Sequence, residues 1–252
     1  MPAAMTRSVI VTGGGRGIGR AVAILAGERG YDVAVNYATN RRAADEVVEA
    51  VTRAGRRAIA VQGDVAREED VLRLFEVAAR ELPPLYGLVN SAGVTGGFAR
   101  VAELGAETLA HVLAVNVAGT VLCAREAVRR LSTRFGGAGG SIVNVSSGAA
   151  RLGGAGEWVH YAASKGAVDT FTRGLAREVA AEGVRVNAVA PGLIDTELHA
   201  AAGAPDRPRR LAGGIPMQRP GTAAEVAEAV LWLLSPAASY VSAAILDVGG
   251  GR

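Results

Sequence analysis

The stretch SVIVTGGGRGIGR, residues 8–20, decides the fold of this chain. Residues 8–12 are a short apolar run typical of a buried strand, and glycines follow at positions 13, 14, 15, 17 and 19. A helical pattern then runs from Arg20 to Arg29, with Gly30 as its expected C-cap. A strand, a glycine-rich turn and a helix in this order predict the first unit of a parallel α/β sheet.

The rest of the chain continues this alternation. Apolar runs predict strands over 32–37, 57–62, 85–90, 141–146, 184–190 and 243–248, and helical patterns cover 42–54, 67–80, 107–134 with a break near Gly119, 159–182 and 222–234. Strands that are apolar on both faces are typical of a parallel sheet with helices on each side. Since no linker, repeat or composition shift divides the chain, we predict one Rossmann-type, doubly wound α/β domain over residues 1–252.

Composition excludes several classes of protein. Half of the 252 residues are hydrophobic and 20% are charged, which excludes an intrinsically disordered chain. The net charge of +3 comes from scattered arginines, so we expect no nucleic-acid partner. The sequence has no uncharged apolar run of about 18 residues and no apolar leader, and its single cysteine, Cys123, is expected to fill the core. We therefore expect a cytoplasmic protein without a membrane span.

The glycine loop predicts a phosphate-binding turn. Glycines let the backbone approach a pyrophosphate, and the following helix supplies free N–H groups and a partial positive charge. The loop fits the pattern T-G-x-x-x-G-x-G and not G-x-G-x-x-G. A flexible turn and a methyl-donor site are the alternatives. The candidate dinucleotide-binding residues of this loop are Thr12, Gly13, Gly15, Arg16, Gly17, Ile18 and Gly19.

The end of the second strand bears on which dinucleotide is bound. NAD-binding folds place an acidic residue there for the ribose hydroxyls, whereas this strand ends in Asn36-Tyr37. Arg16 lies in the glycine loop, and Arg41 and Arg42 follow the strand. Cations without a repelling carboxylate suit a 2′-phosphate, which favours NADP over NAD. The alternative is that these arginines are solvated surface charges.

Tyr161 and Lys165 are the candidate reactive pair. They are four residues apart at the start of a predicted helix, so they share one face. A nearby ammonium stabilises a phenolate and would lower the tyrosine pKa toward neutrality. Of the 27 basic residues, 26 are arginine, and Lys165 is the one lysine. A position that keeps lysine in such a chain indicates a need for a compact ammonium group.

These motifs together resemble the classical short-chain dehydrogenases/reductases, with the glucose-dehydrogenase-like and 3-oxoacyl-carrier-protein-reductase-like members as the nearest types. The resemblance spans about residues 7–250 and rests first on the glycine loop and on Tyr161-x-x-x-Lys165. Further matches are Asn90-Ser91-Ala92-Gly93, Asn116, Ser146-Ser147, Asp64-Val65, and Pro191-Gly192 with Thr196. Position 91 departs from the family, which has a second asparagine there.

The resemblance implies an NAD(P)-dependent oxidoreductase that interconverts a carbonyl and a secondary alcohol. In that family Tyr161 would be the acid or base, Ser147 would orient the substrate oxygen, Lys165 would bind the nicotinamide ribose, and Asn116 would place a water in a proton relay. The cofactor-binding positions outside the glycine loop would be Asn36, Tyr37, Asp64, Val65, Asn90, Ala92, Gly93, Pro191, Gly192 and Thr196. A homotetramer is also implied, with 120–134, 159–182 and 243–250 as candidate interfaces.

The choice between two serines stays open. The family's serine often precedes the tyrosine by 13 residues, whereas Ser147 precedes Tyr161 by 14 and Ser146 by 15. We expect Ser147, assuming one extra residue in the 153–158 loop.

Other residues have weaker signals. His160 is expected behind the site, Trp158 in the pocket wall or in ordinary packing, and residues 193–217 in a lid or variable loop. His111 and His199 have no partner at ligand spacing, so no metal site is expected.

Three alternative functions make different demands on the sequence. A non-catalytic dinucleotide-binding sensor or scaffold would not need the reactive residues. An extended sugar epimerase or dehydratase would need a further domain, and related enoyl reductases space their tyrosine and lysine farther apart.

Overall fold

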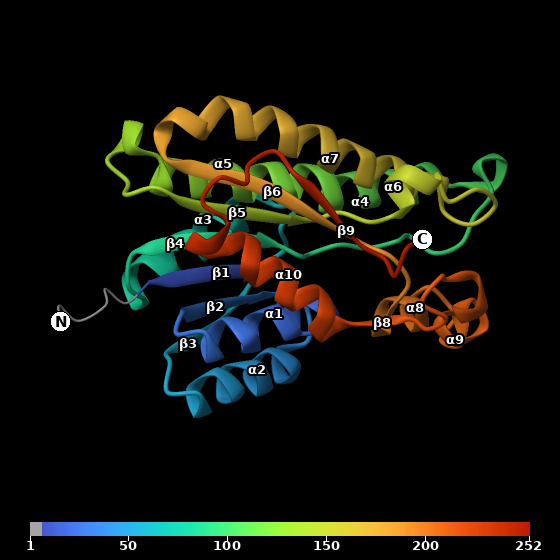
Figure 1. Ribbon diagram of the computed structural model, residues 1–252, viewed down its shortest axis with the longest axis horizontal. Coiled ribbons are helices and arrows are strands. Elements are labelled where there is room, and N and C mark those ends of the chain that lie inside the picture. Colours follow the sequence, from blue (N-terminus) through green and yellow to red (C-terminus); the bar gives the residue numbers. More distant parts are fainter. Residues whose placement is uncertain (1–6) are drawn as a thin grey trace.

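Seven parallel strands form the central sheet of the protein in the computed structural model, which describes residues 7–252 (Figure 1). Their order across the sheet is β3-β2-β1-β4-β5-β6-β9, so the chain reverses its direction of travel between the neighbours β1 and β4. Ligands of such sheets bind outside the carboxyl ends of the strands at this reversal. The strands are β1 (Ser8–Thr12), β2 (Asp32–Tyr37), β3 (Ala58–Gln62), β4 (Leu85–Asn90), β5 (Gly140–Val145), β6 (Val184–Pro191) and β9 (Ile245–Val248).

Helices cover both faces of the sheet (Figure 1). One face carries α1 (Gly17–Glu28), α2 (Arg41–Arg53) and α10 (Ala223–Leu234). The other carries α3 (Glu68–Glu81), α5 (Gly119–Leu131) and α7 (Val159–Val179). This is a Rossmann-type α/β fold, as predicted.

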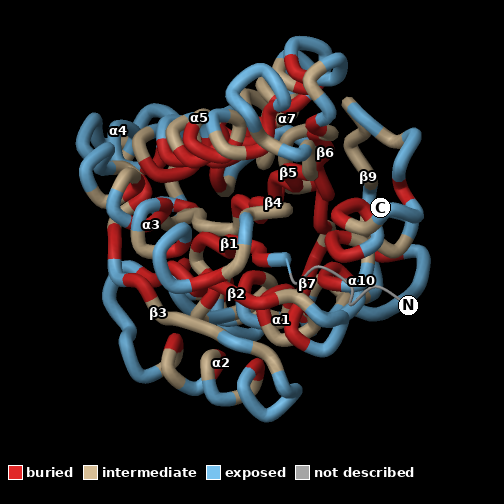
Figure 2. The backbone as a smooth tube through the Cα atoms, turned by 90° about the vertical axis from the view of Figure 1, so that its left-hand side faces the viewer, coloured by how far each residue is buried: buried red, intermediate tan, exposed pale blue. Residues whose placement is uncertain are grey.

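Alternating strand residues supply the two cores. In β1, Val9 and Val11 pack toward α1 and α10, whereas Ile10 packs toward α3 and α5. Successive side chains of a strand point to opposite faces, so a strand covered on both faces must be apolar throughout. Figure 2 shows the central strands mostly as buried tube, whereas the edge strands β3 and β9 are mainly of intermediate exposure.

Two helix boundaries differ from the predictions. α1 begins at Gly17 and not at Arg20, because three residues of the glycine loop form its first turn. The predicted helix over 107–134 is α4 (Ala106–Leu113), a π-helical turn (Ala114–Ala118) and α5, which ends at Leu131. The expected break near Gly119 is therefore a widened turn in a continuous helical stretch, a feature that often marks functional sites.

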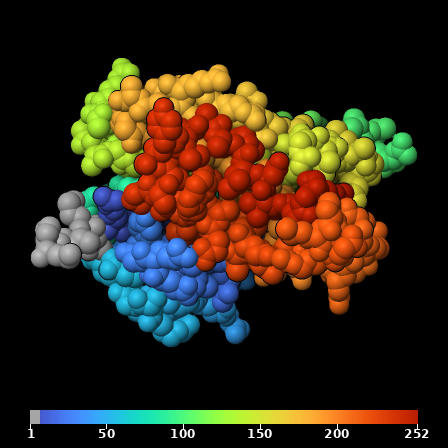
Figure 3. Space-filling view, viewed as in Figure 1, coloured from blue at the N-terminus to red at the C-terminus, as the bar shows by residue number. Residues whose placement is uncertain are grey.

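Residues 193–217, called the arm below, leave the sheet after β6. The arm contains β7 (Ile194–Asp195), α8 (Glu197–Ala201) and α9 (Arg207–Arg210), and β7 pairs with β8 (Gly221–Thr222). A segment expected to be a lid or variable loop thus contains two short helices. Figure 3 shows the arm, in orange, beside the red C-terminal segment, where the amide of Met217 donates to the carbonyl of Gly250 at 3.2 Å. The short helix α6 (Ala149–Leu152) lies at the same end of the molecule (Figure 1).

One helical stretch has the length and composition of a membrane span. It covers Ala106–Leu131 and contains an 18-residue segment with a mean hydropathy of 1.4. Core helices have the same properties, and α5 places Cys123, Ala127 and Leu131, all fully buried, in the core beneath the sheet. Packing in the core accounts for part of this composition, since a third of the apolar segment is buried.

Candidate active site

A cavity of about 650 Å³ opens at the carboxyl ends of the strands. Loops after β1, β2, β3, β4, β5 and β6 contribute to its walls, together with the arm. It brings together most residues that the sequence singles out, namely Gly13, Gly15, Arg16, Gly17, Ile18, Gly19, Asn36, Tyr37, Asp64, Val65, Ala92, Gly93, Ser147, Tyr161, Lys165, Pro191, Gly192 and Thr196.

The glycine loop forms a cradle that side chains would fill. Gly13 has a φ of +61°, and a Cβ there would lie 2.8 Å from the Cα of Ala92. A Cβ on Gly19 would lie 2.3 Å from the carbonyl oxygen of Gly13. No side chain caps the N-terminus of α1 at Arg16, so the first amides of the helix are free for a ligand. The loop therefore fits the pyrophosphate of a dinucleotide.

Thr12 and Asn90, both predicted to bind the cofactor, lie behind the cavity wall and not in it. The Thr12 hydroxyl accepts hydrogen bonds from the amides of Ser91 and Ala92, both at 3.1 Å. The Asn90 amide donates to Asn144 Oδ1 at 2.9 Å. Thr12 thus holds the β4 loop against the end of β1, whereas Asn90 ties β4 to β5. Contact of either side chain with a cofactor would be indirect.

The polar atoms of the Asn36 side chain are hydrogen-bonded to main-chain groups of the protein. Its Nδ2 donates to the carbonyls of Val61 at 3.4 Å and Gly63 at 2.9 Å, and its Oδ1 accepts from the Gly13 amide at 3.3 Å. The side chain therefore ties the loops after β1 and β3 to β2. A carboxylate at this position could not make all three hydrogen bonds, because it could not donate to the two carbonyls.

The predicted cations separate into two groups. Arg16 is exposed and lines the cavity. Arg41 and Arg42 do not, because they pair with Asp45 and Glu46 along the exposed face of α2, both at 3.3 Å. In place of these two arginines, Thr39, Asn40 and Ala43 at the start of α2 reach the cavity wall.

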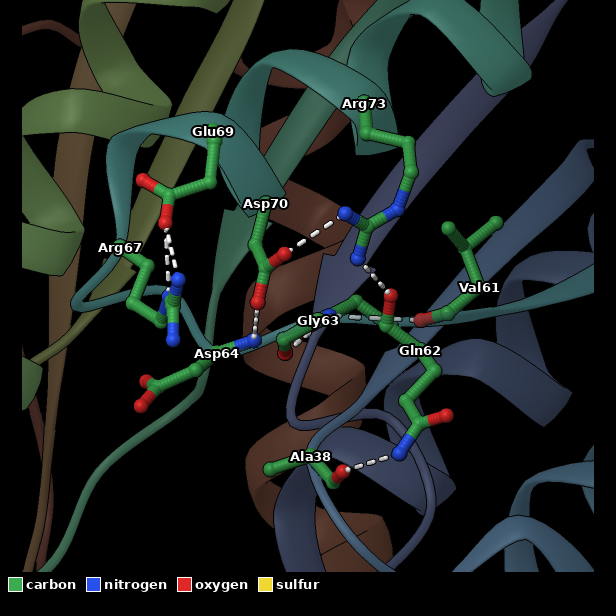
Figure 4. Close-up of polar contacts among 10 residues, drawn as sticks. Ala38, Val61, Gln62, Gly63, Asp64, Arg67, Glu69, Asp70 and Arg73 are labelled. Atoms are coloured by element: carbon green, nitrogen blue, oxygen red, sulfur yellow. Dashed lines mark hydrogen bonds and ion pairs between the residues drawn. The ribbon is translucent and has the colours of Figure 1, made fainter.

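Asp64 is held at the corner between β3 and α3 (Figure 4). Its amide donates to Asp70 Oδ2 at 2.9 Å, and Asp70 in turn pairs with Arg73 at 2.7 Å. The Asp64 carboxylate accepts from the amide of Ala66 at 2.9 Å. Hydrogen bonding from the Asp64 amide holds the pKa of Asp70 below its usual value, so this brace is ionised at neutral pH.

Asn116 lies in the π-helical turn and is fully buried. Its Oδ1 accepts from the Val94 amide at 2.9 Å, and its Nδ2 donates to the Val94 carbonyl at 2.8 Å and to Ser164 Oγ at 3.0 Å. The side chain thus joins the β4 loop to α7. A Cβ on Gly93 would lie 3.4 Å from Asn116 Oδ1 and 3.5 Å from Lys165 Nζ, which places both groups against one glycine.

Both serines line the cavity, but Ser147 hydrogen-bonds toward Tyr161 and Ser146 hydrogen-bonds toward the backbone of α7. The Ser147 hydroxyl hydrogen-bonds with the Tyr161 phenol. Ser146 Oγ instead donates to the Lys165 carbonyl at 3.4 Å and also contacts the Asp169 carboxylate. Burial raises the pKa of Tyr161 above its usual value, while the bond from Ser147 opposes this rise.

Lys165 is 95% buried, one helical turn after Tyr161. Its Nζ donates to the Val145 carbonyl at 2.7 Å and lies 5.7 Å from the centre of the Tyr161 ring. Burial lowers its pKa from 10.5 to about 8, against the weaker pull of Asp169. We predicted that the lysine would lower the tyrosine pKa, yet burial is the dominant effect on both groups, because the Ser147 hydrogen bond to Tyr161 and the Asp169 charge near Lys165 have smaller effects on the two pKa values.

An aromatic cluster stands behind Tyr161. Trp158 is stacked on Phe98 with centroids 4.9 Å apart, and its ring lies 5.7 Å from that of Tyr161. Its role is therefore packing around the site, since it is not among the lining residues. His160 is buried, with its Nε2 2.8 Å from the Thr95 carbonyl, and so lies behind the site as expected.

Sequence reasoning missed several residues of the wall. They come mainly from the arm, the β4 loop and α4, and only their folded positions reveal them, although three directly follow Thr196. They are Ser91, Val94, His111, Val115, Ile194, Glu197, Leu198 and His199. In residues 7–252, no three His, Cys, Asp or Glu side chains are grouped to hold a metal ion.

Comparison with known proteins identifies the family. A family model described as enoyl-(acyl carrier protein) reductase matches residues 13–252. The chain is 52% identical over 243 residues to the "uncharacterized oxidoreductase YgfF" of Escherichia coli (strain K12), covering 96% of this chain and 98% of that protein. Identity to glucose 1-dehydrogenase 2 of Bacillus subtilis (strain 168) is 36%, over 97% and 94% of the two chains. Identity to a short-chain type dehydrogenase/reductase of Picea abies is 35%, over 98% and 92%. The chain therefore belongs to the short-chain dehydrogenase/reductase family and is an oxidoreductase of that family.

Proposed function

We propose that the protein interconverts a secondary alcohol and a carbonyl compound with NADP as the hydride carrier. One observation carries the proposal: the Tyr161–Ser147 pair and the buried Lys165 amine line the same cavity as the glycine cradle. A proton donor and a dinucleotide-binding loop in one cavity are what such a reaction requires. The name of the Bacillus subtilis relative, glucose 1-dehydrogenase 2, supports an alcohol as substrate.

The residues present fit the dinucleotide. Gly13, Gly17 and Gly19 would accept its pyrophosphate at the start of α1, with Asp64 and Val65 on the adenine side and Pro191, Gly192 and Thr196 facing them across the cavity. When bound, the nicotinamide supplies or accepts the hydride.

The chain's own residues handle the proton. Tyr161 gives a proton to the carbonyl oxygen of the substrate, or removes it from the alcohol. Ser147 holds that oxygen through a hydrogen bond, which fixes the substrate relative to the phenol. Lys165 has a pKa of about 8, so it exchanges protons near neutral pH, which an arginine could not do. Asn116 fixes the β4 loop beside Lys165 and is proposed to position a relay water.

NADP is proposed over NAD because of the charges in the wall. Arg16 is the arginine that lines the cavity, and in the described part of the chain the acidic lining residues are Asp64 and Glu197, neither of which is in β2. A 2′-phosphate would thus meet a cation and no carboxylate at the end of β2.

We further propose that residues 1–252 act as one domain and assemble as a homotetramer in the cytoplasm. Sedimentation of the purified protein tests the assembly, because a tetramer of 25.6 kDa chains would sediment far faster than one chain.

The deciding experiment measures NADPH and NADH oxidation in parallel with a panel of ketones and 3-oxoacyl thioesters, and NADP⁺ and NAD⁺ reduction with secondary alcohols. We expect the wild-type protein to turn over with NADPH. In the Arg16→Ala variant, we expect the preference for NADPH over NADH to fall about tenfold, roughly the contribution of one charged hydrogen bond. Turnover with NADH alone would contradict the proposed role of Arg16 in binding the 2′-phosphate. Tight NADPH binding without turnover of any substrate would support the sensor or scaffold.

A further inference from the structure

His199, in α8, is a buried polar residue that the proposed reaction does not use. It lines the cavity and is 5% exposed. Its Nε2 lies 3.1 Å from the carbonyl oxygen of Ile194, but its Nδ1 is buried without a hydrogen-bond partner among residues 7–252. Leaving a buried nitrogen unpaired costs free energy, so such an atom on a residue of the cavity wall indicates where a ligand binds.

The partner of Nε2 fixes the hydrogen of the imidazole ring. A backbone carbonyl only accepts hydrogen bonds, so Nε2 carries the hydrogen and donates it to Ile194. In the neutral ring, Nδ1 then presents a lone pair. Burial and the nearby Arg207 lower the pKa of His199 below its usual value, against the opposing effects of the Ile194 bond, Asp195 and Glu157. The ring is therefore neutral at pH 7 and offers an acceptor.

His199 and Tyr161 line the same cavity, and the Trp158 ring lies beside both of them. The Trp158 ring lies 5.7 Å from the Tyr161 ring and 6.3 Å from the His199 ring, measured between centroids. The indole is itself clamped, because the Arg207 guanidinium stacks 4.6 Å from its centre and pairs with Glu157 at 2.5 Å. A small molecule whose oxygen is bound at Tyr161 thus occupies a cavity whose wall includes His199.

We propose that His199 determines substrate specificity by accepting, at Nδ1, a hydrogen bond from a second hydroxyl group of the substrate. The inference rests on the proposed function, since it names the substrate class for the same cavity. It favours polyols and hydroxylated rings over simple ketones. It also disfavours carboxylates and thioester carbonyls at this position, because neither brings a hydrogen to a neutral imidazole.

The test compares cyclohexanol with cyclohexane-1,2-diol, -1,3-diol and -1,4-diol as substrates, with NADP⁺. These rings differ by one hydroxyl and its position. We expect kcat/KM for one diol to exceed that for cyclohexanol by about 10- to 100-fold, the range for one buried hydrogen bond. A ratio of 1 or less for every diol would overturn the inference.

Two variants of His199 form a matched pair. In His199→Gln, the amide nitrogen can replace Nε2 and keep the bond to Ile194, while the acceptor at Nδ1 is lost. In His199→Asn, the amide oxygen replaces the acceptor at Nδ1. We expect the ratio of diol to cyclohexanol to fall to about 1 in the glutamine variant and to survive in the asparagine variant.

Each outcome has a distinct meaning. A ratio that survives in His199→Gln overturns the role of His199 and leaves the reaction in place. If that variant does not fold, judged by circular dichroism and NADPH fluorescence titration, His199→Asn decides alone, since loss of the ratio there contradicts an acceptor role. A wild-type protein that binds NADPH but turns over no alcohol or ketone overturns the proposed function itself.

Discussion

The glycine loop after β1 and the arm after β6 face the same cavity but are held by different kinds of contact. Main-chain groups of the loop leave no space for added atoms, since a Cβ on Gly19 would meet the Gly13 carbonyl. The Asn36 side chain binds the Gly13 amide, and the Thr12 hydroxyl binds the amides of Ser91 and Ala92. The arm is attached through side chains, chiefly Arg207 on Glu157 and Trp158, and a few amides.

One cavity can therefore be both fixed and adaptable. Close backbone contacts leave no space for a larger side chain, so the loop suits a ligand that never varies, such as a dinucleotide. Side-chain contacts can be exchanged without rebuilding the sheet, so the arm suits the part of the site that selects a substrate. The four predictions below test this contrast.

The largest expected effect is on the chemistry that the sheet and α7 hold in place. Tyr161→Phe removes the phenolic proton and retains the ring against Trp158. We expect kcat to fall about 10²- to 10⁴-fold, the usual contribution of general acid–base catalysis, while NADPH binding is kept. Steady-state kinetics and fluorescence titration check both parts, and a loss of less than tenfold would remove Tyr161 from the role of proton donor.

The next effect concerns the buried charge of Lys165. Its folded pKa of about 8 lies below the usual 10.5, so between these values the unfolded chain binds more protons and stability rises with pH. Lys165→Met lacks this gain. We expect the wild type to gain about 3 kcal/mol relative to the variant between pH 8 and 10.5. Urea unfolding of both proteins across this range measures it, and parallel pH dependences would show that the lysine is not desolvated.

A third prediction tests the backbone packing of the glycine loop. Gly19→Ala places a methyl group 2.3 Å from a carbonyl oxygen, and we expect a loss of about 1–3 kcal/mol in the free energy of unfolding. Gly15→Ala is the matched control, since its Cβ would lie 3.5 Å from Ala44 N, an ordinary contact. Chemical denaturation compares the two. Equal stability of the two variants would mean that the glycine loop shifts readily to accommodate the added methyl group, which would contradict its tight packing.

The smallest effect is expected in the arm. Glu157→Gln leaves the Arg207 side chain, which is 7% exposed, without its carboxylate. We expect about 1 kcal/mol of destabilisation and faster trypsin cleavage after the arginines of α9. Asp206→Asn, which removes an exposed pair with Arg210 at 3.7 Å, serves as the control and should change neither. Slow cleavage in both variants would indicate that the arm is as firmly held as the loop.

The same contrast explains what the sequence could predict. Strands, glycines and the Tyr161–Lys165 spacing depend on neighbours in the chain, so local patterns predicted the sheet and the reactive pair. Asn36 was predicted to face the cofactor, and the structure places it in the cavity wall with its amide bound to three main-chain groups. The spacing to the tyrosine left two serines open, whereas in the folded chain Ser147 contacts the phenol and Ser146 contacts Asp169.

The arm shows where local patterns carry no signal. His199 has no partner at helical or ligand spacing, and its contacts with Ile194 and Trp158 exist only after the arm folds over the site. For Arg41 and Arg42 the local pattern gave a signal that the fold does not follow. Their charge suggested a contact with the cofactor, but in the folded chain they pair with Asp45 and Glu46. Long-range packing decided these positions.

The single lysine has a practical consequence. A protease that cleaves after lysine has one target in this chain, the Lys165–Gly166 bond in the middle of α7. Because that side chain is 95% buried, cleavage requires the helix to open. One cut, giving fragments 1–165 and 166–252, would therefore report the opening of the site as a rate on a gel. Any compound that binds the closed cavity would slow it, so substrates could be sought without assaying turnover.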